Sequence, residues 1–448
     1  MMISSVFKVF ATGPAAPPIK DPARVDALYR RHRTRIMIAI TVGYALSYTC
    51  RLGLSVVKKP LIDGGYFTPA QLGSIGSALF YAYAFGKLTN GFLGDHANVK
   101  RFFAAGLLLS ALANFGMGAV STFWFCAIIW GANGWFQSVG APSSIVSLSN
   151  WFSNRERGSY YGVWGMSHQG GEALTFWLAS ARVAALGWRW GFWGPAAICA
   201  VAALGVFLMT QDRPRTLGLP PVADWRGDHW GTSGERHEDS LLAVQLSILK
   251  RPALWIVALA SAAMYVTRYA INSWGILYLQ EIRGFSLPDA GLVLTASMLG
   301  GVAGTFCFGF ISDKLFASRR PPANLIFGLL ELGGLLLVFY GPTGLVPMMI
   351  GFIVFGFGMG GLITSLGGLF AIDICPKRAA GAALGTVGVF SYLGAGMQEN
   401  ITGALIQKGL HGPHGHNYDF GPAIAFWVGA SVVSLVLATS LWRARAID

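Results

Sequence analysis

Long apolar stretches recur along the 448-residue chain, and they constrain its fold more than any other feature. Only 12% of the residues are charged, whereas soluble domains carry about 25%. About twelve stretches are long enough to cross a hydrocarbon core of about 30 Å at 1.5 Å per residue. Their expected bounds are 36–57, 71–94, 102–120, 123–148, 158–184, 190–210, 253–279, 288–312, 323–341, 344–372, 380–407 and 421–442. The sequence therefore predicts an all-α integral membrane protein with twelve transmembrane helices.

Basic residues are unevenly shared between the connections that join these stretches. Every second connection is rich in Lys and Arg, and so are both termini; the others carry fewer, such as Lys58–Lys59 balanced by Asp63. Because cytoplasmic loops are enriched in Lys and Arg, this pattern places both termini in the cytoplasm. It also explains the net charge of +13 through orientation in a lipid bilayer, so no nucleic-acid partner is expected.

A polar segment rich in Pro and Gly divides the chain into two halves of six spans. We expect a cytoplasmic arm at 1–35, a six-helix bundle at 36–210, a cytoplasmic linker at 211–252, a second bundle at 253–442 and a cytoplasmic tail at 443–448.

The two halves repeat each other in sequence. "GFLGDHANVKR" begins at Gly91 and "GFISDKLFASRR" begins 218 residues later at Gly309, each at the end of the second span of its half. Asp95 and Asp313 occupy matching places and are followed by basic residues such as Arg101, so we interpret these loops as gate loops. Parallel six-span repeats build the major facilitator superfamily, in which the substrate site lies between the halves.

Two arginines lie deep inside equivalent spans. Arg51 and Arg268 are 217 residues apart, and they lie about 24 Å and about 22 Å along the first span of each half. A charge at such depth costs roughly 2.5–3.5 kcal/mol, and no acidic residue lies one helical turn away in either span. We expect the two guanidinium forks to hold a phosphate between the halves. The alternative is that each arginine forms a structural ion pair with an acidic residue of another helix.

Further polar residues on these and other spans are candidate contacts of the substrate. Tyr48, Tyr265 and Asn272 lie beside the arginines. On the fifth span His168 shares a helix face with Trp164 and Glu172, and it titrates near neutral pH. Lys87 lies low in the second span, where snorkelling to the surface is the alternative. Glu399 shares a face with Tyr392, and it either lines the cavity or reaches the outer interface.

Together these motifs resemble the organophosphate:phosphate antiporter family of the major facilitator superfamily, and they are most similar to its hexose-phosphate transporter and sensor branch. The resemblance is carried by "GYALSYTCR", "NGWFQSVGAPSS", "NWFSNRERG", "WGMSHQGG", "DRPRTLGLPPVADW", "YVTRYAINSW" and "SDKLF", and it covers nearly the whole chain. It implies that Arg51 and Arg268 bind phosphate, and it implies substrate contacts for His168 and Lys87. Gln137, in the second motif, joins the candidate substrate contacts.

The resemblance implies a monomeric transporter of the bacterial inner membrane that imports a phosphorylated metabolite, a hexose phosphate or glycerol phosphate, in exchange for inorganic phosphate. Two alternatives remain open: a transporter-like sensor of hexose phosphate with a kinase partner, and a proton-coupled carrier of another organic anion. Glu172 and Glu399 are candidates for coupling or selectivity, because they would offset the positive charge of the arginines. The sequence holds no motif for a nucleotide, a metal or a catalytic nucleophile, so neither a cofactor nor an enzymatic activity is expected.

Overall fold

The computed structural model describes residues 10–228, 245–317, 319–376, 379–411 and 417–442. The predicted tail at 443–448, the basic pair at 377–378 and the middle of the predicted linker, 229–244, lie outside these residues.

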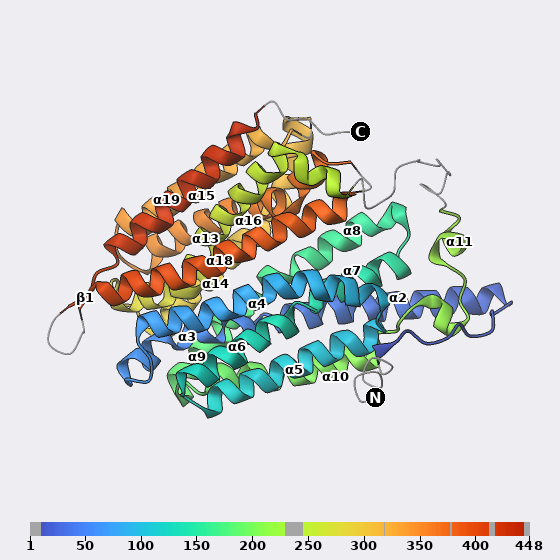
Figure 1. Cartoon of the computed structure of the whole chain (residues 1–448), viewed down its shortest axis with the longest axis horizontal. Coiled ribbons are helices and arrows are strands. Elements are labelled where there is room, and N and C mark those ends of the chain that lie inside the picture. The colour runs from blue at the N-terminus through green and yellow to red at the C-terminus, as the bar shows by residue number, and fades with distance from the viewer. Residues whose placement is uncertain (1–9, 229–244, 318, 377–378, 412–416, 443–448) are drawn as a thin grey trace.

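Helices account for most of the described chain, and they form two groups (Figure 1). The first group contains α2 (Pro22–Ser47), α3 (Thr49–Asp63), α4 (Pro69–His96), α5 (Val99–Ala119), α6 (Phe123–Gln137), α7 (Gly140–Trp151), α8 (Asn154–Gly165), α9 (Ser167–Leu186) and α10 (Trp190–Met209). The second contains α13 (Pro252–Glu281), α14 (Leu287–Leu315), α15 (Arg320–Tyr340), α16 (Leu345–Thr364), η3 (Ser365–Leu369), α17 (Phe370–Asp373), α18 (Ala380–Lys408) and α19 (Gly421–Ser440). Short elements complete the fold: η1 (Pro214–Leu217), α11 (Val222–Arg226), η2 (Ile248–Lys250) and the strands β1 (Leu410–His411) and β2 (Asn417–Tyr418).

The helices have the lengths that a membrane requires. Among the described residues, nine helical runs are long and apolar enough to cross a bilayer, and the joined helices α2 and α3 are one of them. Three more runs of membrane length are the continuous helix α4 and the pairs α6–α7 and α8–α9, and a short turn separates the two helices of each pair. The predicted all-α fold of twelve spans is therefore confirmed.

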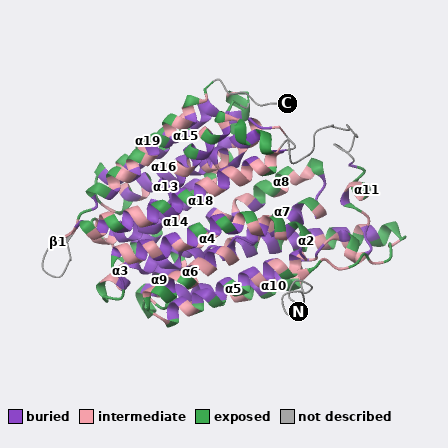
Figure 2. Cartoon of the chain, in the orientation of Figure 1, coloured by how far each residue is buried: buried purple, intermediate pink, exposed green. Residues whose placement is uncertain are grey.

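The outer surface of the helices is apolar, which is the reverse of a soluble protein. Buried residues line the faces that helices turn toward one another, and exposed residues cover the flanks (Figure 2). These flanks expose large apolar side chains, for example Phe306 at 74%, Trp124 at 73% and Val201 at 72% of their surface. Such exposure would destabilise a protein in water but suits contact with lipid.

The two halves contact each other at one end, which we call the closed end. It contains the end of α3, the start of α4, the end of α13 and the start of α14. Here α4 and α18 approach so closely that a Cβ atom at Gly73 would collide with the backbone carbonyl of Glu399. On the other side of the interface, a Cβ at Gly291 of α14 would collide with Ser180 of α9. Glycine at these positions permits the close helix packing that seals this end.

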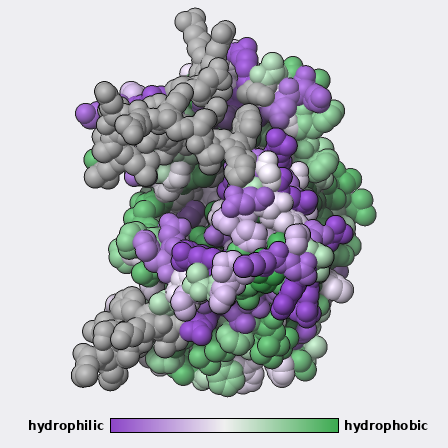
Figure 3. Space-filling model, turned by 90° about the vertical axis from the view of Figure 1, so that its right-hand side faces the viewer, coloured by the Kyte–Doolittle hydropathy of each residue, from purple (hydrophilic) through white to green (hydrophobic). Residues whose placement is uncertain are grey.

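At the opposite end the halves separate. There α8 packs mainly against helices of its own half, α2, α7 and α9. Figure 3 looks onto this end, where hydrophilic residues gather across the middle and hydrophobic residues lie along the flanks. We call it the open end.

The described start of the linker packs against the first half at the open end. The ring of Tyr29 stacks on Trp225 with centroids 4.2 Å apart, and the Trp151 indole donates to the Asp212 carbonyl oxygen at 2.9 Å. Arg33 of α2 forms an ion pair with Glu156 of α8 at 2.6 Å. The contacts of Trp225 and Asp212 hold the described part of the segment after α10 to the first half.

Candidate functional site

Arg51 lies in the first turn of α3, directly after the turn at Tyr48 that separates α2 from α3. Its side chain is buried, and its guanidinium lies between the rings of Tyr48 and Tyr83, 4.3 and 4.4 Å from their centroids. Nε donates to the Gln137 side-chain oxygen at 2.9 Å, and Nη1 donates to the Tyr392 hydroxyl at 3.4 Å. Among the described residues, Nη2 has no hydrogen-bond partner and Arg51 has no carboxylate partner, so its charge is buried without a compensating negative charge.

Arg268 has a different environment, although the sequence places it in the equivalent span. Its Nη2 donates to Oε1 of Glu172 on α9 at 2.5 Å, and both side chains are almost fully buried. Asn272, one turn further along α13, donates to the other carboxylate oxygen at 3.3 Å. The guanidinium also lies 5.5 and 5.2 Å from the ring centroids of Tyr265 and Tyr269. This is the ion pair that the sequence left open as the alternative, so the two arginines do not form a symmetric pair of free forks.

Lys87 extends the positive charge around Arg51. It is half-buried on α4, with Nζ 5.3 Å from the centroid of Tyr392. The ring of Tyr392 in turn packs on Tyr83 at 4.3 Å. Tyr392, a residue of the second half, therefore contacts both Arg51 and Lys87 of the first half.

His168 and Trp164 lie on either side of a turn at Met166, so the predicted continuous face of the fifth span is broken. His168 is the second residue of α9, and its ring is 6.0 Å from Tyr48. Its Nδ1 contacts the Gly165 carbonyl oxygen at 2.5 Å, whereas Nε2 is buried without a partner among the described residues. Trp164 packs on Tyr44 at 4.9 Å, and no contact to either arginine is recorded for it in the described part of the chain.

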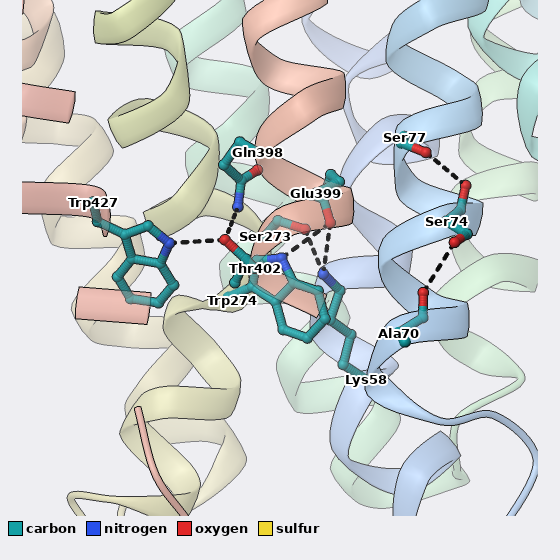
Figure 4. A network of polar contacts seen from close by, with 10 residues as sticks. All are labelled: Lys58, Ala70, Ser74, Ser77, Ser273, Trp274, Gln398, Glu399, Thr402 and Trp427. Carbon is teal, nitrogen blue, oxygen red and sulfur yellow. Dashed lines mark hydrogen bonds and ion pairs between the residues drawn. The ribbon is translucent and has the colours of Figure 1, made fainter. Parts of the chain in front are cut away.

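A second cross-half ion pair involves a residue that the sequence analysis missed. Lys58 is fully buried within α3, so its assignment to an outer loop is wrong. Its Nζ donates to Glu399 of α18 at 3.1 Å and to the Ser273 hydroxyl at 2.6 Å, and it lies 3.3 Å from the ring centroid of Trp274 (Figure 4). The Trp274 indole donates to the same Glu399 oxygen at 3.0 Å. Glu399 thus lies between the halves and does not reach the outer interface.

A small cavity links Arg51 to this ion pair. Its lining combines charged groups, hydroxyls and aromatic rings: Arg51, Leu52, Leu54, Ser55, Gly76, Leu79, Phe80, Trp130, Tyr269, Ser273 and Glu399. Oε1 of Glu399 is buried, and no described residue forms a hydrogen bond with it. The cavity therefore has a cationic end at Arg51 and a hydrogen-bond acceptor at Glu399.

The predicted gate loops differ between the halves. In the second half, Arg320 joins Asp313 and Asp373, with donor–acceptor distances of 2.9 and 2.6 Å. In the first half, the Asp95 carboxylate has no partner among the described residues, and its backbone carbonyl accepts from Arg213. The backbone amide of Arg101 donates to the side chain of Asn98, which caps α5.

Sequence reasoning missed Lys58, Tyr83 and Tyr269. Tyr83 precedes Lys87 by one helical turn, and Tyr269 follows Tyr265 by one helical turn, so helical periodicity could have found both. Lys58 stands next to Lys59 and Pro60, and this pattern is typical of the end of a span.

Two helical halves that enclose buried charges define a membrane transporter. The chain belongs to the Major Facilitator Superfamily, whose family model matches residues 35–398, and the resemblance to its organophosphate:phosphate antiporter branch is confirmed by its relatives. It is therefore a member of a transporter family rather than an enzyme.

The relatives match the chain over most of its length. Membrane sensor protein UhpC of Salmonella typhimurium is 34% identical over 402 residues, which cover 87% of this chain and 89% of UhpC. A probable hexose phosphate transport protein of Chlamydia trachomatis is 31% identical and covers 98% of this chain and 97% of that protein. The glycerol-3-phosphate transporter of Bacillus subtilis is 30% identical, with 96% of this chain and 97% of the relative covered.

Solved structures support the fold alone. A bacterial homologue of the human lysosomal transporter Spinster, in an inward-facing and unoccupied conformation, superposes with a TM-score of 0.74 at 16% identity. The superposition covers 93% of this chain and 99% of that chain.

Proposed function

We propose that the chain is a secondary transporter of a phosphorylated small molecule, and that the phosphoryl group binds at Arg51. The observation that carries this proposal is the buried guanidinium of Arg51, which has a free Nη2 and no carboxylate partner among the described residues. An unpaired buried charge is costly, and an anionic ligand offsets that cost. The free nitrogen is positioned to donate to a phosphate oxygen, as guanidinium groups commonly do.

The balance of buried charge supports a phosphate monoester. Arg268 is neutralised by Glu172, and Lys58 is neutralised by Glu399. Arg51 and Lys87 then remain as neighbouring cations of the centre without a carboxylate in the described chain. A phosphoryl group carries a charge of about −1.5 to −2 near pH 7, which matches two cations.

Exchange with inorganic phosphate follows from the same site. Inorganic phosphate presents the same oxygens as an organophosphate, so the two compete for Arg51 and Lys87. Relatives named as hexose phosphate and glycerol-3-phosphate transporters support this class of substrate. In the proposed cycle, the halves rock between the observed arrangement and one that opens the closed end. The bacterial relatives support a location in the inner membrane, and the distribution of Lys and Arg supports termini and an open end in the cytoplasm.

A sensor of hexose phosphate is the second candidate, because one of the relatives at 34% identity is named a membrane sensor protein. Counterflow in proteoliposomes separates the two candidates. Vesicles loaded with phosphate should take up labelled hexose phosphate or glycerol phosphate if the chain is a transporter. Binding of the sugar phosphate without flux would favour the sensor.

Arg51→Lys tests the site directly. It keeps the charge but loses the fork, so at least one charge-assisted hydrogen bond is lost, which is worth about 1.5–3 kcal/mol. We expect phosphate affinity, and uptake at low substrate concentration, to fall by roughly 10- to 150-fold. Arg189→Lys is the matched control, because Arg189 is exposed beside Trp188. Normal phosphate binding by Arg51→Lys would exclude Arg51 from the site.

A further inference from the structure

Two of the ion pairs between the halves are reciprocal; a third, between Lys59 and Glu281, lies at the closed end. In one pair, Glu172 from the fifth span of the first half bonds Arg268 from the first span of the second half. In the other, Glu399 from the fifth span of the second half bonds Lys58 from the first span of the first half (Figure 4). In each pair, the carboxylate thus lies on the fifth span of one half and the cation lies on the first span of the other half. Lys58 lies about 10 Å further toward the closed end than Arg51, because seven residues of helix separate them.

The pairs differ in what the cation can bind besides its carboxylate. Lys58 is enclosed by Ser273 and Trp274. Arg268 lines a second cavity together with Glu172 and Asn272, and residues of α14 and α16 complete the lining: Ser297, Met298, Gly301, Phe355, Gly356, Met359 and Ile363, with Gln169 of α9. Arg268 therefore borders space in which a ligand oxygen could replace the carboxylate.

We propose that Glu172 is a proton-binding site that couples substrate binding to protons. This proposal rests on the proposed function and adds one step to it: the phosphoryl group bound at Arg51 must also reach Arg268 and compete there with Glu172. When the phosphoryl oxygens take over the guanidinium, the carboxylate of Glu172 loses its counter-ion in a buried place. It then takes up one proton from the water on the loading side and becomes a neutral carboxylic acid. When the phosphoryl group leaves, the proton is released and the ion pair forms again.

Among the described residues, no other carboxylate lies beside Glu172 to receive this proton. The titratable groups near it are Arg268 and Tyr265 on α13 and His168, one turn away on its own helix. Helix α3 also packs against α9, and Tyr48 and Arg51 lie at its start. The side chains that α14 and α16 contribute to the cavity are not titratable. Among these groups Glu172 alone is a carboxylate that loses its partner when an anion binds.

The proposal has a consequence for the transport cycle. In the empty carrier, Glu172 neutralises Arg268. When the empty carrier returns to its other arrangement, it therefore contains one unpaired buried cation fewer than a carrier without Glu172 would. Phosphate–phosphate exchange carries one proton in each direction and shows no net proton movement. Net uptake of phosphate should carry a proton with it.

Calorimetry on the purified full-length protein tests this, with inorganic phosphate as the probe. Binding is measured at pH 8, where phosphate is mainly a dianion, in buffers with different heats of ionisation. We expect the wild type to take up about one proton more per phosphate bound than Glu172→Gln does. Glu331→Gln is the matched control, since it removes a buried carboxylate that bonds Ser431 and does not contact Arg268, and it should behave as the wild type does.

Equal proton uptake by the wild type and Glu172→Gln would overturn the proposal while leaving phosphate binding, and so the proposed function, intact. Absence of phosphate binding to the wild type would refute the proposed function and this proposal with it. Glu172→Asp, which keeps a titratable group, should restore proton uptake. In proteoliposomes that contain a pH-sensitive dye, net phosphate uptake should acidify the lumen for the wild type and not for Glu172→Gln. Acidification by both proteins would also count against Glu172.

Discussion

The buried pair between Lys58 and Glu399 makes a quantitative prediction about the closed end. Both side chains are almost fully buried, at 0% and 1% exposed, and Nζ lies 3.1 Å from the carboxylate oxygen. Glu399→Gln removes one charge and leaves the ammonium group buried without a counter-ion. Removing one partner of a buried ion pair costs about 3–5 kcal/mol.

The partners belong to different halves, so this cost applies to the observed arrangement and not to the folding of either half. In the proposed cycle the closed end opens, and Lys58 then reaches water. The equilibrium between the two arrangements should therefore shift toward the one that opens the closed end. Since 1.4 kcal/mol is a factor of ten, the shift should be roughly 100- to several thousand-fold.

Distances between spin labels measure this shift. Labels at Tyr66 and Pro288, exposed positions of the two halves at the closed end, are introduced after the five native cysteines have been replaced. The wild type should give a short, narrow distance distribution. Glu399→Gln should give a longer and broader one.

Two controls make the result decisive. Glu331→Gln alters a carboxylate that is equally buried but bonds Ser431 within the second half, so it should leave the distances unchanged. The double change Lys58→Met with Glu399→Gln removes both charges and should largely restore the short distance. The reasoning is refuted if Glu399→Gln keeps the wild-type distribution, or if Glu331→Gln opens the closed end as much.

Two further predictions concern helix packing and the open end. Gly73→Ala should weaken the contact between α4 and α18 by about 1–3 kcal/mol, because the added Cβ collides with the backbone of Glu399. The distance between the labels at Tyr66 and Pro288 should lengthen as a result. Gly91→Ala is the control and should leave this distance unchanged, because Gly91 lies on the same helix with open space around it. At the open end, burial acts to raise the pKa of Glu156, but its hydrogen bond to Arg33 outweighs this and the pKa lies below its ordinary value. This ion pair should stabilise the protein above a pH of about 4.3 and lose its effect as the pH falls through the depressed pKa. Glu156→Gln should therefore lower the melting temperature at pH 7 and leave it unchanged in acid.

The sequence predicts the fold well because the signals for it are local. Each signal can be measured within a few dozen residues or across one repeat. These signals are the length of an apolar stretch, the spacing of the Gly–Asp loops and the equivalent depths of Arg51 and Arg268. Helix breaks are harder to predict. The turns at Tyr48 and Met166 keep backbone angles close to helical, and no proline or glycine stands at either position to mark them.

The charge pairing could not be predicted in the same way. A search for acids one helical turn from Arg268 finds none, because its partner Glu172 lies 96 residues away on a helix of the other half. Lys58 and Glu399 are 341 residues apart, and neither is flanked by a pattern that points to the other. Ion pairs between halves depend on how the halves dock, and helical periodicity within one span carries no information about docking.

This difference between local and docking information explains why the internal repeat misleads at the centre of the molecule. Equivalent positions suggest equivalent roles for Arg51 and Arg268, yet a carboxylate on α9 neutralises Arg268, whereas Arg51 has no carboxylate partner among the described residues. The two reciprocal pairs each join a first span of one half to a fifth span of the other half. They lie at different depths along the molecule, because Lys58 lies further along its span than Arg268 does. The pseudo-symmetry therefore fixes the scaffold, and the positions of a few buried charges break it. A site that must bind an asymmetric organophosphate needs such a break, since one end of the ligand is a dianion and the other is not.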